Sequence, residues 1–206
     1  MMRDYSNYLK KYPWLKGYDP YPESEADLST CALNWIPEGW VDAFGELMCQ
    51  ELDAALRKTD QYDEAYVVEA KEKFGELRMW IHPPNEETDR ILMKYEAISA
   101  HVCMHCSAVD VPMLNIGHWL SVYCRHCYDK MNSDGRHKPY DEVVDGDAEM
   151  PIVVKWSRFG KNGTEHFEMD IRETVEKIRK RCAERKANGE FEGDLFEGWE
   201  DNYYGA

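Results

Sequence analysis

Cys103-Met104-His105-Cys106 and, after the 17 residues 107–123, Cys124-Arg125-His126-Cys127 are the stretch of this sequence that decides its fold. A C-x-x-C turn lets two thiolates converge on one ion, and two such turns about 15 to 20 residues apart are a frequent zinc-binding pattern. The pattern predicts that Cys103, Cys106, Cys124 and Cys127 bind one zinc ion. Four thiolates fill a tetrahedral ion and leave no position for water, so we expect a structural site rather than a catalytic one.

Two alternatives stay open for these residues. The four thiols could be buried without a metal, because cysteine packs well as a small hydrophobic side chain. His105 and His126 lie inside the two turns and could each replace a cysteine as ligand, although the four cysteines are the simpler set. Cys31, Cys49 and Cys182 stand alone, and we interpret them as core residues.

The residues around the cysteine pairs suit a treble clef, in which a knuckle, a hairpin and a second knuckle at a helix start follow one another. A hairpin through Gly117 is predicted over 113–123, and a helix over 128–131. A treble clef can support an HNH nuclease, and the run 125–130 is similar to the end of such a site. That chemistry needs two histidines at the hairpin, and His118 alone does not supply both. The sequence contains no phosphate-loop, dinucleotide-binding, nucleophile-elbow or H-E-x-x-H motif, so we expect a non-enzyme.

Apolar residues recur at helical spacing in some segments and alternate in others, which predicts mixed structure. Gly75 and Asn162-Gly163 mark two hairpin turns, Asp170 is placed to cap the last helix, and Gly189 is placed to end it. Helices are predicted over 4–12, from 39 to about 55, over 87–102 and over 171–189, and strands over 66–69, 77–81, 152–156 and 167–169.

Four segments follow from these patterns. Residues 1–131 form a helix and hairpin region that ends in the zinc module at about 102–131, and 132–150 form an acidic linker. Residues 151–189 form a hairpin plus a helix, and 190–206 form an acidic tail. The predicted fold class is α+β, with small antiparallel hairpins and helices around a treble-clef-like zinc module with four cysteine ligands.

The amino-acid composition indicates what class of protein this is and in which compartment it is expected. The 206 residues are 43% hydrophobic and 13% aromatic, which favours a folded protein over a disordered one. No apolar run approaches the roughly 20 residues of a membrane helix, and the first residues do not resemble a secretory signal. Seven cysteines, four of them in C-x-x-C pairs, fit a reducing compartment. We therefore expect a cytoplasmic protein that does not bind membranes.

The net charge of −15 argues against general affinity for nucleic acid, but the charge is unevenly spread. Residues 172–186 are rich in Lys and Arg, whereas 190–201 hold six acids and no base. One interpretation is a solvated helix face followed by a polar tail. The other is a nucleic-acid-binding zinc protein whose acidic tail folds onto the helix and competes with phosphate. Its candidate contacts are Arg125, Arg136, Lys138, Arg179, Lys180 and Arg181.

The run 71–78, Lys-Glu-Lys-Phe-Gly-Glu-Leu-Arg, resembles a K-E-K-F-G-x-L-R signature of uncharacterised proteins encoded by tailed bacteriophages and prophages. In those proteins a tryptophan-containing helix precedes the signature, and a helix and a zinc knuckle follow it. Gly39-Trp40 and the cysteine pairs match, so the resemblance covers about 35–130. Ser107 stands where the family has a glycine. The resemblance implies a phage setting and no mechanism.

The signature also has a purely structural interpretation. Gly75 permits a turn, and Phe74 and Leu77 are expected to pack inward. Lys71, Lys73 and Arg78 are expected on the solvent face.

The leading hypothesis is a zinc-stabilised accessory protein, not an enzyme, that binds and modulates a host protein. It would imitate DNA phosphate with its acidic surface or inhibit a host defence factor. Exposed aromatic residues are typical binding anchors, although some of these side chains are expected to pack over the core. The candidate anchors are Trp14, Trp35, Trp199, Tyr203 and Tyr204.

Overall fold

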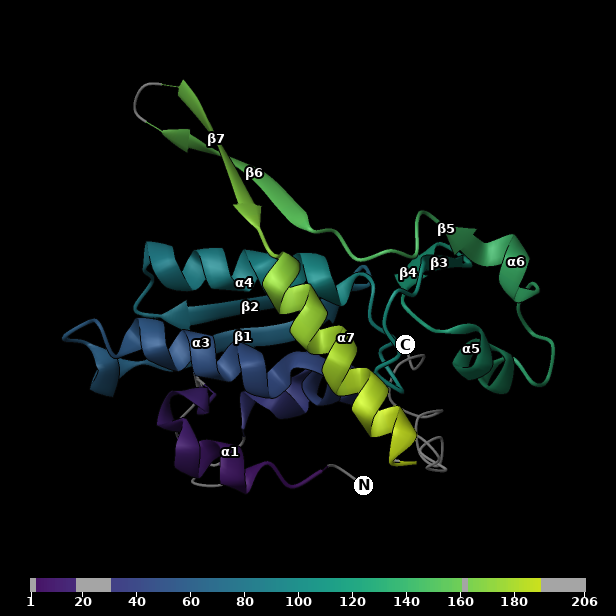
Figure 1. Ribbon diagram of the computed structural model, residues 1–206, viewed down its shortest axis with the longest axis horizontal. Helices are drawn as coiled ribbons and strands as arrows, with labels where there is room; N and C mark the ends of the chain where they lie inside the picture. Colours follow the sequence, from purple (N-terminus) through teal and green to yellow (C-terminus); the bar gives the residue numbers. More distant parts are fainter. Residues whose placement is uncertain (1–2, 18–30, 161–162, 190–206) are drawn as a thin grey trace.

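The computed structural model describes residues 3–17, 31–160 and 163–189, and it shows the predicted α+β fold (Figure 1). Short 3₁₀ turns and one π-helical turn, Val41–Gly45, join the helices. The helices are α1 (Ser6–Lys11), α2 (Glu38–Trp40), α3 (Glu46–Leu56), α4 (Glu86–Ser99), α5 (Arg125–Met131), α6 (Tyr140–Val143) and α7 (Arg172–Ala187). The strands are β1 (Tyr66–Lys73), β2 (Glu76–His82), β3 (Met113–Ile116), β4 (Trp119–Ser121), β5 (Val144–Asp145), β6 (Val153–Gly160) and β7 (Gly163–Asp170). Within these ranges no helix combines the length and the apolar character needed to cross a bilayer.

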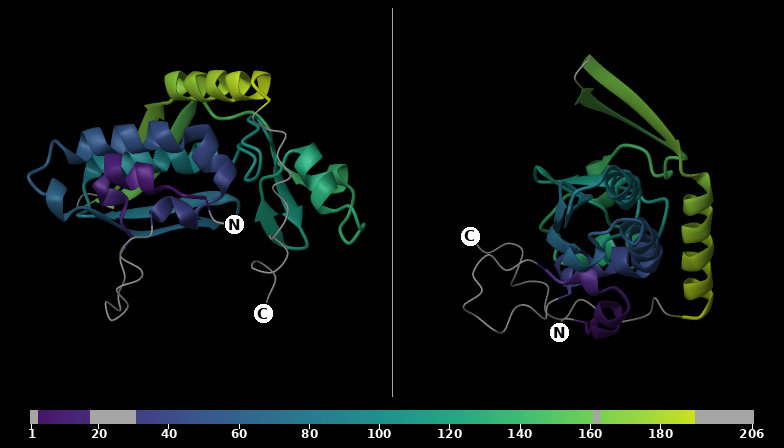
Figure 2. Two further views of the ribbon diagram at one scale, coloured as in Figure 1. Left: turned by 90° about the horizontal axis from the view of Figure 1, so that it is seen from below. Right: turned by 90° about the vertical axis from the view of Figure 1, so that its left-hand side faces the viewer.

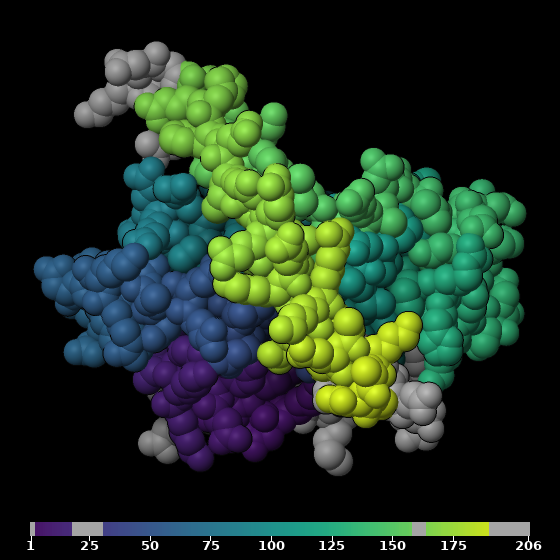
Figure 3. Space-filling view, in the orientation of Figure 1, coloured from purple at the N-terminus to yellow at the C-terminus, as the bar shows by residue number. Residues whose placement is uncertain are grey.

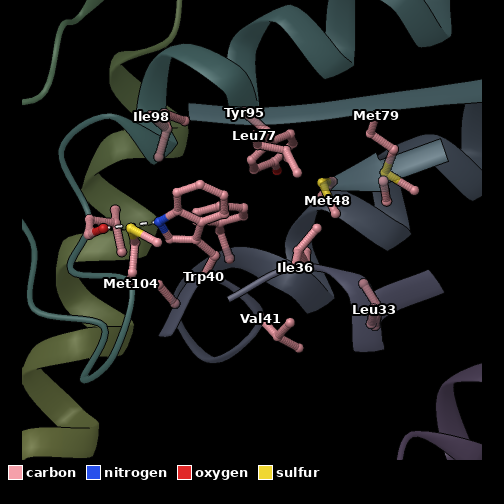
Figure 4. Close-up of a cluster of buried hydrophobic side chains, with 14 of the residues drawn as sticks. Leu33, Ile36, Trp40, Val41, Met48, Leu77, Met79, Tyr95, Ile98 and Met104 are labelled. Atoms are coloured by element: carbon pink, nitrogen blue, oxygen red, sulfur yellow. Dashed lines mark hydrogen bonds between the residues drawn. The ribbon is translucent and has the colours of Figure 1, made fainter. Parts of the chain in front are cut away.

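The body of the molecule is the β1–β2 hairpin with α3 and α4 on one of its faces (Figure 2). Apolar side chains alternate along β2, so that Leu77, Met79 and Ile81 point toward the helices. Trp40 and Tyr95 fill the space between them (Figure 4). A single buried cluster of side chains extends from this core into the cysteine region.

The β1–β2 turn corrects one prediction. The strands are longer than expected and leave a two-residue turn, Phe74-Gly75, with φ values of 58° and 77°. Two positive φ values are what a type I′ hairpin turn requires. Leu77 is buried as predicted, but Phe74 is 55% exposed. The inward position opposite Leu77 belongs to Glu72, which accepts a hydrogen bond from the Gly75 N–H (2.6 Å).

The cysteine module, residues 102–131, follows the predicted order of knuckle, hairpin and knuckle. β3 and β4 pair antiparallel through the Gly117 turn, which confirms the predicted hairpin. The helix that was predicted over 128–131 already begins at Arg125, directly after Cys124. The second knuckle therefore forms the first turn of α5.

The segment 132–150 was predicted to be a linker, but the structure shows that part of it is folded. It contains α6 and β5, and β5 pairs with β3. Tyr140 packs edge-on against Tyr128 of α5, with ring centroids 5.7 Å apart. Tyr140, Val143 and Met150 are buried in the common core. The segment is therefore an extension of the cysteine module.

The C-terminal unit is an arm, β6–β7, followed by α7, which lies across the front of the body (Figure 3). Gly160 of β6 pairs with Gly163 of β7, and Asn162 of the predicted Asn162-Gly163 turn lies outside the described residues. Val175, Ile178 and Cys182 of α7 are buried, so Cys182 is a core residue as predicted. Asp170 was predicted to cap this helix, but Ile171 is the residue that directly precedes it. The Asp170 carboxylate lies one position earlier and accepts the Arg172 N–H (2.9 Å).

Candidate metal centre

The four predicted cysteines converge. Their sulfur atoms all lie within 4.8 Å of one another. Cys106 Sγ and Cys124 Sγ are 3.6 Å apart, close to the separation of about 3.8 Å for two ligands of a tetrahedral ion with metal–sulfur bonds of about 2.3 Å. Cys103 and Cys127 are buried, and Cys106 and Cys124 are partly exposed. The four thiols are placed to hold one metal ion.

The backbone of the first knuckle aims its sulfur atoms inward. The Cys103 N–H donates to the Ala108 carbonyl (2.8 Å), and the Ser107 N–H donates to the Cys103 carbonyl (3.2 Å). Ser107 has a φ of 59°, in the left-handed region that favours glycine. A glycine would adopt this conformation at no steric cost. The Ser107 hydroxyl donates to the Cys106 carbonyl (2.5 Å) and accepts from Arg185 (3.4 Å).

The motif Gly39-Trp40 packs directly on this knuckle. The Trp40 indole N–H donates to the Val102 carbonyl (3.0 Å; dashed line in Figure 4). The Gly39 N–H donates to the Met104 carbonyl (3.0 Å). A Cβ on Gly39 would lie 2.3 Å from the Cys103 carbonyl oxygen. Gly75, the other motif glycine, contacts β3 and β4, where its Cβ would lie 3.1 Å from Met113. Both motif glycines therefore allow the cysteine module to approach the body closely.

The electrostatics of the thiols indicate what a cation would supply. Burial raises the pKa of the Cys103 thiol, whereas the hydrogen bond with Cys103 is the largest cause that lowers the pKa of Cys106 and of Cys124. A central cation would favour the thiolate form of all four sulfurs. A complete shell of four sulfur ligands leaves no position for a bound water, so such an ion would stabilise the fold and would not activate a nucleophile.

The histidines do not join the ligand set. Among the residues that the structure describes, the four cysteines form the one group of His, Cys, Asp or Glu side chains that could share a metal ion. His105 is partly buried, and desolvation lowers the pKa of its imidazole. His126 is exposed on α5, and His118 is exposed at the β3–β4 turn. Within the described ranges, nothing assembles around His118 that resembles the two-histidine site of a nuclease.

The candidate nucleic-acid contacts near the module are mostly engaged. Arg125 forms an ion pair with Asp141 and lies over the Tyr140 ring, 4.5 Å from its centroid. Arg136 forms an ion pair with the aspartate two residues before it. Lys138 is exposed. The guanidinium groups of this region therefore neutralise local acids.

The basic helix α7 turns three of its four arginines toward the body. Arg179 donates two hydrogen bonds to Asp110 (2.7 and 2.9 Å), and Arg181 donates to the Asp42 carbonyl (3.0 Å). Arg185 pairs with the Asp42 carboxylate (3.0 Å). Lys180 lies on the outer face, 3.9 Å from a glutamate one helical turn later. The arginines dock the helix, so Lys180 is the one candidate of this helix on a solvent face.

The Arg179–Asp110 contact is expected to contribute to the stability of the folded protein. Burial opposes ionisation of Asp110, but hydrogen bonds from Arg179 and from the Met150 N–H lower its pKa overall. Its stabilisation is therefore complete above the pKa of an unfolded aspartate and is lost as the pH falls through the lowered folded-state pKa. Asp110→Asn is expected to lower the free energy of unfolding by about 2 kcal/mol, because hydrogen bonds to a charged group are lost. Urea denaturation at several pH values measures this effect.

Glu149→Gln is the matched control, because Glu149 is an exposed carboxylate 3.9 Å from the same guanidinium. It is expected to change the unfolding free energy by less than about 0.5 kcal/mol. Equal effects of the two substitutions would show that the Asp110 pair does not hold α7.

The proposed aromatic anchors are placed differently from the prediction. Trp14 is 1% exposed and donates its indole N–H to Asp53 (3.2 Å), so it is not available to a partner. Trp35 is partly buried, because its ring lies against Gly17. Trp199, Tyr203 and Tyr204 lie outside the described residues. Two of the five anchors are therefore committed wholly or partly to the interior.

Sequence reasoning missed two exposed aromatic side chains beside the module. Phe74 is exposed at the β1–β2 turn, and Trp119 is 65% exposed on β4. Phe74 precedes Gly75, whose Cβ would lie 3.6 Å from the Leu120 backbone, and Trp119 precedes Leu120. The two residues are thus chain neighbours of one contact between hairpins, and we call Phe74 and Trp119 the tip surface. A bulky residue before the glycine of a two-residue turn was the signal available in the sequence.

No protein-family model, curated protein or solved structure matches this chain.

Proposed function

We propose that this protein is a non-enzymatic interaction module that binds a protein partner through the tip surface, with one structural zinc ion holding that surface in place. The observation that carries the proposal is Phe74, a large aromatic side chain that is exposed to solvent and held at a φ of 58°. A bulky residue in this region costs on the order of 1 to 3 kcal/mol, and such strain concentrates at functional sites. Folding alone would favour Asn at this position.

The metal supports the same proposal. The sulfur-only ligand set and its tetrahedral spacing fit zinc, which thiolates bind in structural sites. The ion would fix the first knuckle, whose Met104 N–H donates to the carbonyl of Val122, the residue directly after β4 (2.8 Å). Trp119 would then be presented at a fixed distance from Phe74. Large rigid aromatics of this kind are frequent hot spots of protein interfaces.

Because the sequence resembles phage proteins, the partner that we propose is a protein of the bacterial host. The net charge of −15 supports a partner with a basic surface, including an enzyme that normally binds DNA phosphate. The nucleic-acid alternative has less support, because three arginines of α7 already contact Asp42 and Asp110.

Phe74→Asn separates folding from function. It creates the Asn-Gly dipeptide that type I′ turns favour, so the unfolding free energy is expected to rise by about 0.5 to 1 kcal/mol. The melting temperature should then rise by roughly 1 to 4 °C. Capture of the partner from host lysate is expected to fall below detection when this change is combined with Trp119→Ser.

Trp80→Ser is the control for this experiment. Trp80 is 51% exposed on the outer face of β2, five residues beyond Gly75 and roughly 15 Å along the strand. The Trp80→Ser variant should still capture the same protein in near-stoichiometric amount. Undiminished capture by the tip-surface variant would contradict the proposal, and so would the recovery of nucleic acid in place of protein.

A further inference from the structure

A groove lies between the first turn of α4 and the arm. Its volume is about 410 Å³, within the size range of ligand sites in proteins. One side is formed by α4 and the loop before it, and the other side by the arm. Its lining residues include Pro84, Glu86, Asp89, Arg90, Trp156 and Phe167. We call it the arm groove.

The aromatic wall of the arm groove is not part of the core. Val154 and Met169 at the base of the arm pack against the buried cluster, but Trp156 and Phe167 do not belong to it. These two residues are register partners across β6 and β7, and their rings stack with centroids 5.3 Å apart and an interplanar angle of 14°. The arm itself projects from the body (Figure 1). A stacked aromatic pair on such an arm offers apolar area and a negative π face to a ligand.

The opposite wall carries the carboxylate of Asp89, which is exposed in the first turn of α4. Glu87, which is next to the groove, forms an ion pair with Lys58 (2.6 Å). Asp89 has no ion pair and no side-chain hydrogen bond to any residue that the structure describes. Partial burial and the charge of Glu86 raise the pKa of Asp89. The lining acids, Glu86 and Asp89, outnumber the single lining cation, Arg90.

We propose that the arm groove binds a short basic peptide segment, whose lysine or arginine side chain lies on the Trp156–Phe167 wall and pairs with Asp89. A cation satisfies both walls at once, because it is attracted by the aromatic faces and by the carboxylate. Met93 and Pro84 would take the aliphatic part of the same side chain. A phosphate group would be repelled by Glu86 and Asp89 and attracted by Arg90 alone among the lining residues. This site does not depend on the tip surface.

Titration of the full-length, ¹⁵N-labelled protein with a blocked pentapeptide, acetyl-Ala-Leu-Arg-Leu-Ala-amide, tests the proposal by NMR. The indole N–H of Trp156, assigned from its loss in Trp156→Phe, and the first-turn amides of α4 are expected to shift with a dissociation constant of about 1 mM. Asp89→Asn should weaken binding about threefold to fivefold, the range of a partly exposed ion pair. Trp156→Ala should abolish it.

Two controls keep the result specific. Lys155→Gln changes the exposed face of the same strand and should leave the affinity unchanged. The same peptide with Glu in place of Arg should not bind. The proposal is overturned if the Arg peptide causes no shift at about 10 mM. It is also overturned if Asp89→Asn binds as tightly as the wild type, or if the Glu peptide or a single-stranded oligonucleotide binds in place of the Arg peptide. Because neither Phe74 nor Trp119 takes part, failure here leaves the tip-surface proposal untouched.

Discussion

Cys127→Ser is expected to abolish the cooperative unfolding transition of the cysteine module. Cys127 is 2% exposed, and its sulfur belongs to the group of four that lie within 4.8 Å. A serine hydroxyl at this site is a poor substitute for a thiolate ligand of zinc. The binding free energy of a structural zinc ion is on the order of 10 kcal/mol, as large as the whole stability of a typical domain. The variant should therefore lose both its metal and the ordered packing around Trp40.

Metal analysis and thermal unfolding measure the two parts of this prediction. The wild-type protein should contain one equivalent of zinc, and the variant less than about half an equivalent. The dispersion of amide signals from β3, β4 and α5 should collapse in the variant. Cys182→Ala is the control, because it removes a buried thiol of α7 that is not a ligand. It should cost only about 1 kcal/mol and keep the metal. Full metal content in Cys127→Ser would contradict the ligand assignment.

The cysteine module could be predicted because its signals are local. Ligand spacing, the Gly117 turn and the helix after Cys124 all lie within a run of 29 residues, 103–131. The same applies to Gly75, which marks the β1–β2 turn. Phe74 was placed wrongly because inward alternation was continued into the turn itself. In a two-residue turn the alternation stops at the last paired residues, here Lys73 and Glu76.

Long-range contacts were beyond the sequence. The segment 132–150 is polar and reads as a linker, but β5 pairs with β3 some 30 residues earlier. Trp14 is buried and donates a hydrogen bond to Asp53, 39 positions away. In α7, Arg179 binds Asp110, which lies 69 positions earlier, and Arg181 binds Asp42, which lies 139 positions earlier. Charge and hydrophobicity along a chain do not specify such partners, so a docked basic helix could not be distinguished from a free one.

Gly39→Ala is expected to produce the second large effect, and its sign separates packing from local propensity. Alanine favours a helix by about 1 kcal/mol over glycine, so propensity alone would make this variant more stable. A Cβ here would instead lie 2.3 Å from the Cys103 carbonyl oxygen and 2.7 Å from the Met104 carbonyl carbon. Both atoms belong to the backbone of the first knuckle, which the metal would hold in place. We expect a net loss of about 3 kcal/mol.

The melting temperature should accordingly fall by roughly 6 to 12 °C, and zinc should be lost at a lower chelator concentration than in the wild type. Gly117→Ala is the control within the same module, because no atom lies within 4 Å of its Cβ position and its cost comes only from a φ of 59°. It should cost about 1 kcal/mol and leave the chelator sensitivity unchanged. The decisive result is that Gly39→Ala makes the protein lose its metal more easily. This result requires that α2 and the first knuckle share one packed backbone contact. A Gly39→Ala protein as stable as the wild type would mean that this contact does not exist in solution.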